Sequence, residues 1–306
     1  MSDSLMTPGT DTAADVSELE GMSVEGRSFA QQAWKRFRRH KLAIISSIAL
    51  VLIALTFLLG PILSPFTVEE IDIANRLQGP GNPHYFGTDA LGRDLFVRTV
   101  DGGRFSLLIA IVVSLLTTVI GTVIGALGGY LGGWVDGVLS QLTNLFLIVP
   151  ALVILIVVGR QYGGSPISTA ILLGVLLWPQ IARIVRGLFL QYKNQEFVLA
   201  ARAAGAKSPR IMFRHILPNT IGPIVVSATL LIGTAIILES TLSFLGLGVQ
   251  APDTTLGTLV ADAKGSLTER PYELLLPAGF IIGITLAVNF LGDALRDALD
   301  PTTGRS

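Results

Sequence analysis

Few residues of this chain are of the types that carry out catalysis. The sequence has no cysteine, which excludes a thiolate nucleophile, a disulfide framework and a cysteine-ligated metal. Its three histidines, His40, His84 and His215, lie outside the long apolar stretches. A protease or metal-dependent lipase embedded in those stretches would need a serine–histidine pair or a set of metal ligands inside them. We therefore predict no catalytic residue and no metal site.

The segment 87–94 (GTDALGRD) superficially resembles a phosphate-binding loop. Such a loop has Lys and then Ser or Thr after its second glycine, whereas Arg93 and Asp94 follow here, and no other such motif occurs. We expect that the chain binds no ATP by this route and that the segment caps an outer mouth. Direct solute contact through Asp89, Arg93 and Asp94 is the alternative. Asp94 and Arg98 are four residues apart, a spacing that allows an ion pair on a helix.

One acidic residue, Glu239, lies inside an apolar stretch, with Ser243 one turn further on. A charged group at the centre of a bilayer costs about 2.5–3.5 kcal/mol on insertion scales, so such a residue indicates function by default. We expect Glu239 to hold the helices or a gate together through hydrogen bonds, with direct substrate binding as the alternative. A proton relay is disfavoured, because the other apolar stretches carry no chain of acids or histidines.

The composition indicates that lipid surrounds most of the chain. Half of the residues are hydrophobic, 14% are charged and the mean hydropathy is +0.63. A soluble domain has about a quarter charged residues. The formal net charge of zero disfavours a basic nucleic-acid-binding protein.

Six apolar runs have the length of about 20 residues with which a helix crosses a bilayer. They lie at 42–60, 105–130, 138–158, 167–187, 220–245 and 274–295. Lipid-exposed backbone must be helical or belong to a closed barrel, and the alternating pattern of barrel strands is absent. The sequence therefore predicts an all-α polytopic membrane protein with six transmembrane helices.

Basic residues gather on one side of the predicted membrane. They are Lys35, Arg36, Arg38, Arg39 and Lys41 before the first run, and Arg183, Arg186, Lys193, Arg202, Lys207, Arg210 and Arg214 at the end of the fourth run and after it. The loop between the first two runs is acidic instead. Because loops on the cytoplasmic side carry the excess of Lys and Arg, both termini and the segment 188–217 are expected in the cytoplasm.

The chain is predicted to divide into four regions. These are a disordered acidic tail at 1–28, a basic segment with the first helix and a long outer loop at 29–104, a five-helix core at 105–298 with a cytoplasmic loop at 190–217, and a short tail at 299–306. The first region lacks the basic start and apolar core of a signal peptide. The outward loop 246–273 is either a lid on its own bundle or a contact for another protein.

Three further features concern the packing of the helices. Pro179 is expected to bend or break the fourth run, and Arg183 and Arg186 are interpreted as interfacial anchors. A stripe of small residues predicts close packing, within the subunit or against a partner. The stripe consists of Gly121, Gly125, Gly129 and Gly133.

The cytoplasmic stretch 194–219 reads as two short helices. Asn194 is expected to cap the first and Gly205 to end it, while Ser208 and Pro209 begin the second as cap and first helical residue. A helix this short is marginal alone, so it is expected to dock on a partner; a loop folded on its own helix ends is the alternative. A helix-turn-helix DNA reader is excluded because both ends are tethered to membrane spans.

The run 196–205 (EFVLAARAAG), followed by 215–219 (HILPN), resembles the EAA loop of permease subunits in ATP-binding-cassette importers. The resemblance implies that this loop is a coupling helix that fits a cleft on an ATPase subunit. Leu199 stands where the motif has Glu, and Glu196 is a candidate substitute. The implied coupling residues are Glu196, Ala200, Ala201, Arg202, Gly205, Ser208 and Arg210.

Two more segments, 86–94 (FGTDALGRD) and 239–248 (ESTLSFLGLG), resemble the dipeptide and oligopeptide branch of these importers, specifically its C-type permease. This resemblance runs from about 29 to 301. It implies a multi-pass subunit of a prokaryotic cytoplasmic membrane, which works with a homologous permease, an extracytoplasmic solute-binding protein and one or two ATPase subunits that hold ATP and Mg. Peptides are the implied cargo; nickel, glutathione or an opine, and an ion-driven secondary transporter, are the alternatives.

Overall fold

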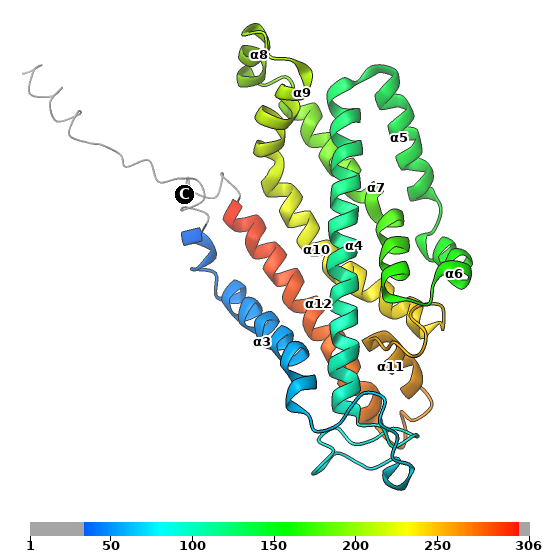
Figure 1. Ribbon diagram of the computed structural model, residues 1–306. Helices are drawn as coiled ribbons and strands as arrows, with labels where there is room; N and C mark the ends of the chain where they lie inside the picture. Colours follow the sequence, from blue (N-terminus) through cyan, green and yellow to red (C-terminus); the bar gives the residue numbers. More distant parts are fainter. Residues whose placement is uncertain (1–33, 300–306) are drawn as a thin grey trace, which may run out of the picture.

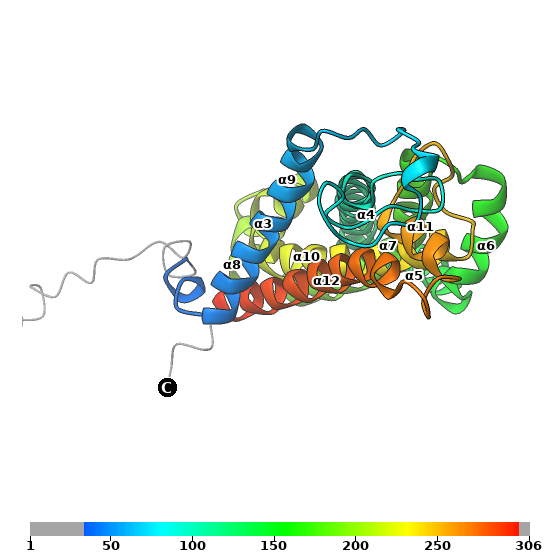
Figure 2. The same cartoon turned by 90° about the horizontal axis from the view of Figure 1, so that it is seen from below.

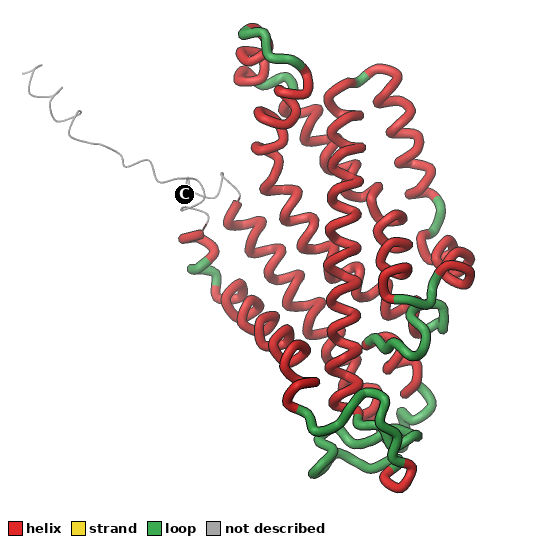
Figure 3. Tube along the Cα trace, in the orientation of Figure 1, coloured by secondary structure: helices red, strands yellow, loops and turns green. Residues whose placement is uncertain are grey.

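The computed structural model describes residues 34–299, and within that range the chain is helical and has no strand. The predicted tail 1–28 and residues 300–306 lie outside the described residues. Figures 1 and 3 show a bundle of long helices. The long helices are α3 (Lys41–Leu63), α4 (Leu95–Leu131), α5 (Gly133–Ile148), α6 (Ala151–Tyr162), α7 (Pro166–Tyr192), α10 (Leu217–Phe244) and α12 (Pro271–Leu299).

Short elements connect the long helices. They are the 3₁₀ turn η1 (Ile73–Asn75), α8 (Glu196–Ala203), α9 (Ser208–Arg210), the π-helical segment η2 (Ile211–Ile216) and α11 (Leu256–Ala263). The segment between α3 and α4 is otherwise irregular, and it lies beside α11 at one end of the bundle (Figure 1).

Five described helices are long and apolar enough to cross a membrane, and a sixth span results if α5 and α6 count as one. The third predicted span, 138–158, is therefore not one straight helix, because α5 and α6 meet at an angle of 82°. Val149 is extended at the break, since a residue before proline disfavours the helical conformation and Pro150 itself has no N–H to donate. The predicted break at Pro179 does not occur, and α7 continues through it.

The long segments alternate in direction along the bundle (Figure 1). The start of α3, the end of α12 and α8 lie toward one end, here called the α8 end, whereas the loop before α4 and α11 lie at the other, here called the α11 end. Figure 2, seen from below, shows α4 nearly end-on, α3 and α12 tilted across the view, and α11 and α6 to one side. This alternation agrees with the even number of crossings predicted from the sequence.

The contact between α4 and α7 is the most extensive in the bundle. A Cβ atom added to Gly125 would lie 2.5 Å from the carbonyl oxygen of Ala182, and one added to Gly129 would lie 2.7 Å from that of Arg186. Gly121 meets the backbone of α7 in the same way. Three of the four glycines of the predicted stripe thus pack within the subunit, whereas a Cβ atom added to Gly133 would meet no atom within 4 Å among the described residues outside its own turn.

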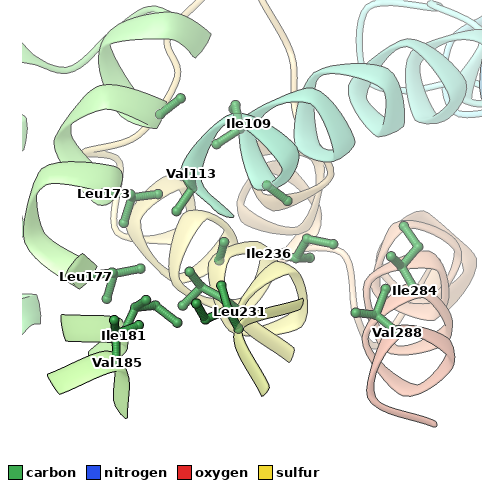
Figure 4. Packing of buried hydrophobic residues seen from close by; sticks show 14 of the residues in the cluster. Ile109, Val113, Leu173, Leu177, Ile181, Val185, Leu231, Ile236, Ile284 and Val288 are labelled. Atoms are coloured by element: carbon green, nitrogen blue, oxygen red, sulfur yellow. The ribbon is translucent and has the colours of Figure 1, made fainter. Parts of the chain in front are cut away.

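An apolar core connects α4, α7, α10 and α12 (Figure 4). Its labelled members are Ile109, Val113, Leu173, Leu177, Ile181, Val185, Leu231, Ile236, Ile284 and Val288. In contrast, α3 exposes most of its apolar residues. Exposed apolar surface of this extent on a spanning helix is what a lipid-facing element requires.

Replacing Gly125 with Ala should separate α4 from α7, because the new methyl group meets a backbone carbonyl that has no freedom to move aside. We expect a loss of about 1–3 kcal/mol of stability, the usual effect of overpacking. Thermal unfolding of the purified protein in detergent measures it. The matched control is Gly187→Ala on α7, where the added Cβ would meet no other described segment within 4 Å and the change should be neutral or stabilising by up to about 1 kcal/mol. Equal melting temperatures for the two variants would contradict the packing argument.

Candidate functional site

The short helix α8 begins one residue later than predicted. Gln195 is its N-cap and makes no side-chain capping bond, so Asn194 does not cap it. Glu196 lies in the first turn, as expected, where the helix dipole favours an anion.

The end of α8 agrees with the prediction that Gly205 stops it. Gly205 has φ +82°, a left-handed conformation that glycine adopts without a steric penalty. Its N–H donates to the carbonyl of Arg202 at 3.0 Å, and the N–H of Ala206 donates to that of Ala201 at 3.0 Å. These two bonds form a Schellman motif, which satisfies the last carbonyls of the helix.

The second predicted short helix is not separate. Lys207 rather than Ser208 is the N-cap, with no side-chain capping bond, and α9 continues through η2 directly into α10. Pro209 lies in the first turn, where a missing N–H is harmless. Pro218 marks the entry to α10, which begins at Leu217, and the wide π turn of η2 before it keeps the chain helical from α9 onward.

Several apolar side chains of α8 and η2 are exposed at the α8 end, and together they are here called the α8 surface. Its members are Phe197, Leu199 and Ala200 on α8 and Phe213 on η2. Leu199 is 48% exposed and Phe213 65%. Val198, on the opposite side of α8, is fully buried and attaches the helix to the bundle.

The other predicted coupling residues surround the α8 surface. Arg202, Ser208 and Arg210 are exposed, as are Glu196 and Gly205, and Ala201 is half-buried. Figure 1 shows that α8 projects beyond the ends of its neighbours, so the sequence-predicted set is brought together at one tip of the bundle.

Glu239 lies at the opposite end of α10, fully buried. Its Oε1 accepts a hydrogen bond from Ser243 Oγ at 2.8 Å, and its Oε2 accepts from Ser106 Oγ of α4 at 3.2 Å and from Ser240 Oγ at 3.4 Å. The predicted interhelical hydrogen bond is therefore present, between α10 and α4.

The same network reaches α11. Ser106 Oγ also accepts from the N–H of Leu256 at 3.0 Å, and Thr255 Oγ1 donates to Ser243 Oγ at 3.4 Å. Thr255 is the N-cap of α11 and accepts from the N–H of Thr258. Glu239 and these hydroxyls, here called the hydroxyl cage, thus join α4, α10 and α11. Neither Ser106 nor Thr255 was predicted from the sequence, in which the only signal is the pattern Thr255-x-x-Thr258 of a helix start.

Asp89 ties the loop before α4 to the bundle. Its Oδ2 accepts from Arg93 Nε and from a terminal nitrogen of Arg98, both at 2.7 Å. Arg98 also reaches Asp262 of α11 at 3.4 Å. Arg98 is also buried, so loss of Asp89 would leave a buried guanidinium without its main partner.

The predicted pair of Asp94 and Arg98 does not form. Asp94 Oδ2 lies 2.9 Å from His84 Nδ1, and Asp94 Oδ1 accepts from the N–H of Val97 at 2.9 Å. Asp94 is thus the N-cap of α4, which begins at Leu95, before the predicted run at 105. The carboxylate of Asp94 is held by His84 and by its own first turn, and Arg98 pairs with Asp89 instead.

A polar cavity of about 390 Å³ lies beside Asp89 at the α11 end. Its charged lining residues are Asp89, Arg93, Arg98, Asp262, Arg270 and Glu273. Arg270 donates from Nε to Glu273 at 2.6 Å, and this bond raises the pKa of Arg270 above its ordinary value. The positive and negative side chains of the lining are equal in number, so the cavity has no net charge with which to select an ion.

The two predicted interfacial arginines have different surroundings. Arg186 holds both carboxylate oxygens of Asp136 on α5, at 2.5 and 2.7 Å. Arg183 donates to the side-chain oxygen of Asn144 at 3.1 Å. Both therefore connect α7 to α5. The sequence did not predict these contacts, because two apolar runs do not reveal which of their residues face each other.

Comparison with known proteins identifies two matching families. Residues 121–305 match the binding-protein-dependent transport system inner membrane component, and residues 28–80 match the N-terminal transmembrane domain of oligopeptide transport permease C. The chain is 44% identical over 284 residues to the oligopeptide transport system permease protein OppC of Escherichia coli K12, covering 92% of this chain and 94% of that one. It is 38% identical to the dipeptide transport system permease protein DppC of Alkalihalophilus pseudofirmus, covering 89% of each.

A solved structure resembles the fold. A chain of the MetNI methionine ABC transporter, in inward-facing conformations, superposes with a TM-score of 0.55 at 21% identity, covering 67% of this chain and 96% of that one. At this identity the likeness concerns the fold alone.

Replacing Ser106 with Ala should loosen α11, because it removes a donor to Glu239 and the acceptor of the Leu256 N–H at once. Leaving buried polar groups unpaired costs about 1–3 kcal/mol. Hydrogen exchange of the α11 amides is the measurement, and faster exchange at Leu256 is the expected result. Ser227→Ala is the matched control, since that hydroxyl bonds only the carbonyl of Pro223 in its own helix. Unchanged exchange in the Ser106 variant would show that the hydroxyl cage does not hold α11.

Proposed function

The chain belongs to the family of inner membrane components of binding-protein-dependent transport systems, and on this premise we propose that it is one permease subunit of an ATP-driven peptide importer. The observation that carries the proposal is the 44% identity to an oligopeptide permease along 92% of the chain. The relatives named for oligopeptides and for dipeptides both extend over nearly the whole chain, which favours peptides over nickel, glutathione or an opine as cargo.

The proposed importer consists of several subunits. This chain and a homologous permease enclose the pathway, one or two ATPase subunits hold ATP and Mg, and an extracytoplasmic binding protein delivers the solute. In this assignment the chain performs transport and carries out no covalent step. The basic residues around α8 place the α8 end in the cytoplasm by the positive-inside rule, and with it the start of α3 and the end of α12.

The α8 surface is the proposed contact for the ATPase. An eight-residue helix is too short to be stable alone, and this one presents apolar side chains at the tip of the bundle. Val198 attaches α8 to the core, and α9 and η2 continue into α10 without a break. A displacement of α8 by an ATPase is therefore transmitted directly to α10, and through Tyr192 to the end of α7.

The hydroxyl cage is proposed to hold the outer end of the pathway. Glu239 accepts from three serine hydroxyls and is fully buried, so its oxygens are not available to a passing solute. It connects α10, which receives the displacement of α8, to α11 and α4 at the α11 end. We assign Glu239 and Ser243 to this latch, and Asp89, Arg93 and Asp94 to the fixed cap over it.

The cargo is tested by reconstituting the co-purified complex in liposomes with its binding protein. We expect that uptake of a labelled tripeptide requires ATP at the cytoplasmic face of the complex and the binding protein at the opposite face. Nickel, glutathione and an opine are assayed under the same conditions. Uptake of one of these solutes without uptake of the tripeptide would show that the peptide assignment of the cargo is wrong. Transport by the chain alone under an ion gradient would show that it is not a subunit of an ATP-driven importer.

Ala200→Glu should abolish co-purification of the ATPase, because it introduces a charge into the apolar α8 surface without a clash in the fold. Loss of a central interface contact weakens binding by about tenfold or more. Pull-down with a tag on this chain, followed by ATPase activity, is the measurement. The matched control is Ala74→Glu, an exposed alanine of η1 at the α11 end. Equal ATPase recovery from both variants would exclude α8 as the contact.

A further inference from the structure

A second polar cavity, of about 240 Å³, lies between α4, α5 and α7. Its polar lining residues are Ser140, Thr143, Asn144, Arg183 and Arg186. The volume is below the roughly 300–1,000 Å³ of sites that enclose a drug-sized ligand. The cavity therefore suits one small polar group rather than a whole peptide.

The charge in this cavity is not balanced. Asp136 is fully engaged by the two-pronged bond from Arg186 and also accepts from Ser140 Oγ at 3.1 Å. Arg183 has no carboxylate within 4.0 Å among residues 34–299. Its one hydrogen bond in that range goes to the neutral side chain of Asn144, although a guanidinium has five N–H donors.

Asn144 adds donors to the same place. Its side-chain oxygen is taken by Arg183, while its amide nitrogen has no acceptor among the described residues. Free N–H groups of a cation and of an amide thus converge on one cavity. Such an exposed donor set, with no free carboxylate beside it, is complementary to an oxyanion.

The position of Arg183 along α7 identifies the source of the oxyanion. Residues 166–182 of α7 carry no charge, and these 17 residues span about 26 Å, close to the thickness of the hydrocarbon layer. Arg183 is the first charged residue after them, on the side of the α8 end, so it lies at the depth of lipid headgroups. Leu147 and Ile148, exposed apolar residues one helical turn after Asn144 on α5, provide an adjacent surface for acyl chains.

We propose that Arg183 and Asn144 bind the phosphate of an anionic phospholipid in the leaflet at the α8 end. The negative surface potential of a leaflet rich in anionic lipids favours this site further. The bound headgroup provides the counter-ion that Arg183 lacks among the described residues. It also holds α5 against α7 near the ion pair of Asp136 and Arg186. The proposal does not depend on the identity of the cargo.

The test uses the full chain purified with its partner subunits in a neutral detergent. Native mass spectrometry follows the binding of phosphatidylglycerol, of phosphatidylcholine with the same acyl chains, and of inorganic phosphate. We expect selective binding of phosphatidylglycerol, weakened about fivefold by Arg183→Gln. Arg160→Gln removes an equal charge from the exposed end of α6 and should leave binding unchanged.

A second variant protects the test against a folding defect. Asn144→Asp places a carboxylate next to Arg183, so the folded protein should keep its thermal stability and still lose selective binding of phosphatidylglycerol. Equal binding of both lipids by the unmodified complex would overturn the proposal, as would unchanged selectivity in Asn144→Asp. Displacement of the lipid by an equal concentration of inorganic phosphate would assign the site to free phosphate instead and would also overturn it.

Discussion

The backbone contact between α4 and α7 is the constraint on which the other contacts of the bundle depend. Within lipid, no hydrophobic force brings helices together, so association relies on close packing and on hydrogen bonds. Gly121, Gly125 and Gly129 provide that packing, because each leaves room for the backbone of α7. With α7 in place, Arg186 reaches Asp136 and fixes α5, and α10 packs against both α4 and α7. The position of α8 follows, since it comes directly after α7, and α11 is held against α4 and α10 by the hydroxyl cage.

The two ends of the bundle differ in how completely their polar and apolar groups are satisfied. At the α11 end, Glu239 is surrounded by hydroxyls and Asp89 by two guanidinium groups, so these buried charged groups have their partners within the chain. At the α8 end, by contrast, Phe197 and Leu199 are exposed and Arg183 has no counter-ion among the described residues. The α8 end therefore presents to a partner a guanidinium without a counter-ion and apolar side chains of a short helix.

Much of the fold could be predicted from the sequence, because the apolar runs, the basic loops and Gly205 are local signals. Each of the six runs corresponds to a helix or, at 138–158, to a bent pair that Pro150 alone did not reveal. The location of α8 and the burial of Glu239 were also accessible. The hydrogen-bond partners of these residues could not be predicted, because they depend on distances between separate segments of the chain. Examples are the bond from the Leu256 N–H to Ser106, the contact of Asp94 with His84, and the pairing of Arg98 with Asp89. Spacing along a single helix carries no information about such contacts.

The length of α4 has a mechanical consequence. Its 37 residues extend over about 55 Å, nearly twice the thickness of the hydrocarbon layer. Three glycine contacts with α7 act on its second half, and the ion pairs of Asp89 and Arg98 lie at its first turn. The helix is therefore a lever arm with its fulcrum near α7. A tilt of about 5° about that fulcrum would swing the far tip by several ångströms, roughly the width of one side chain, without any helix having to unwind.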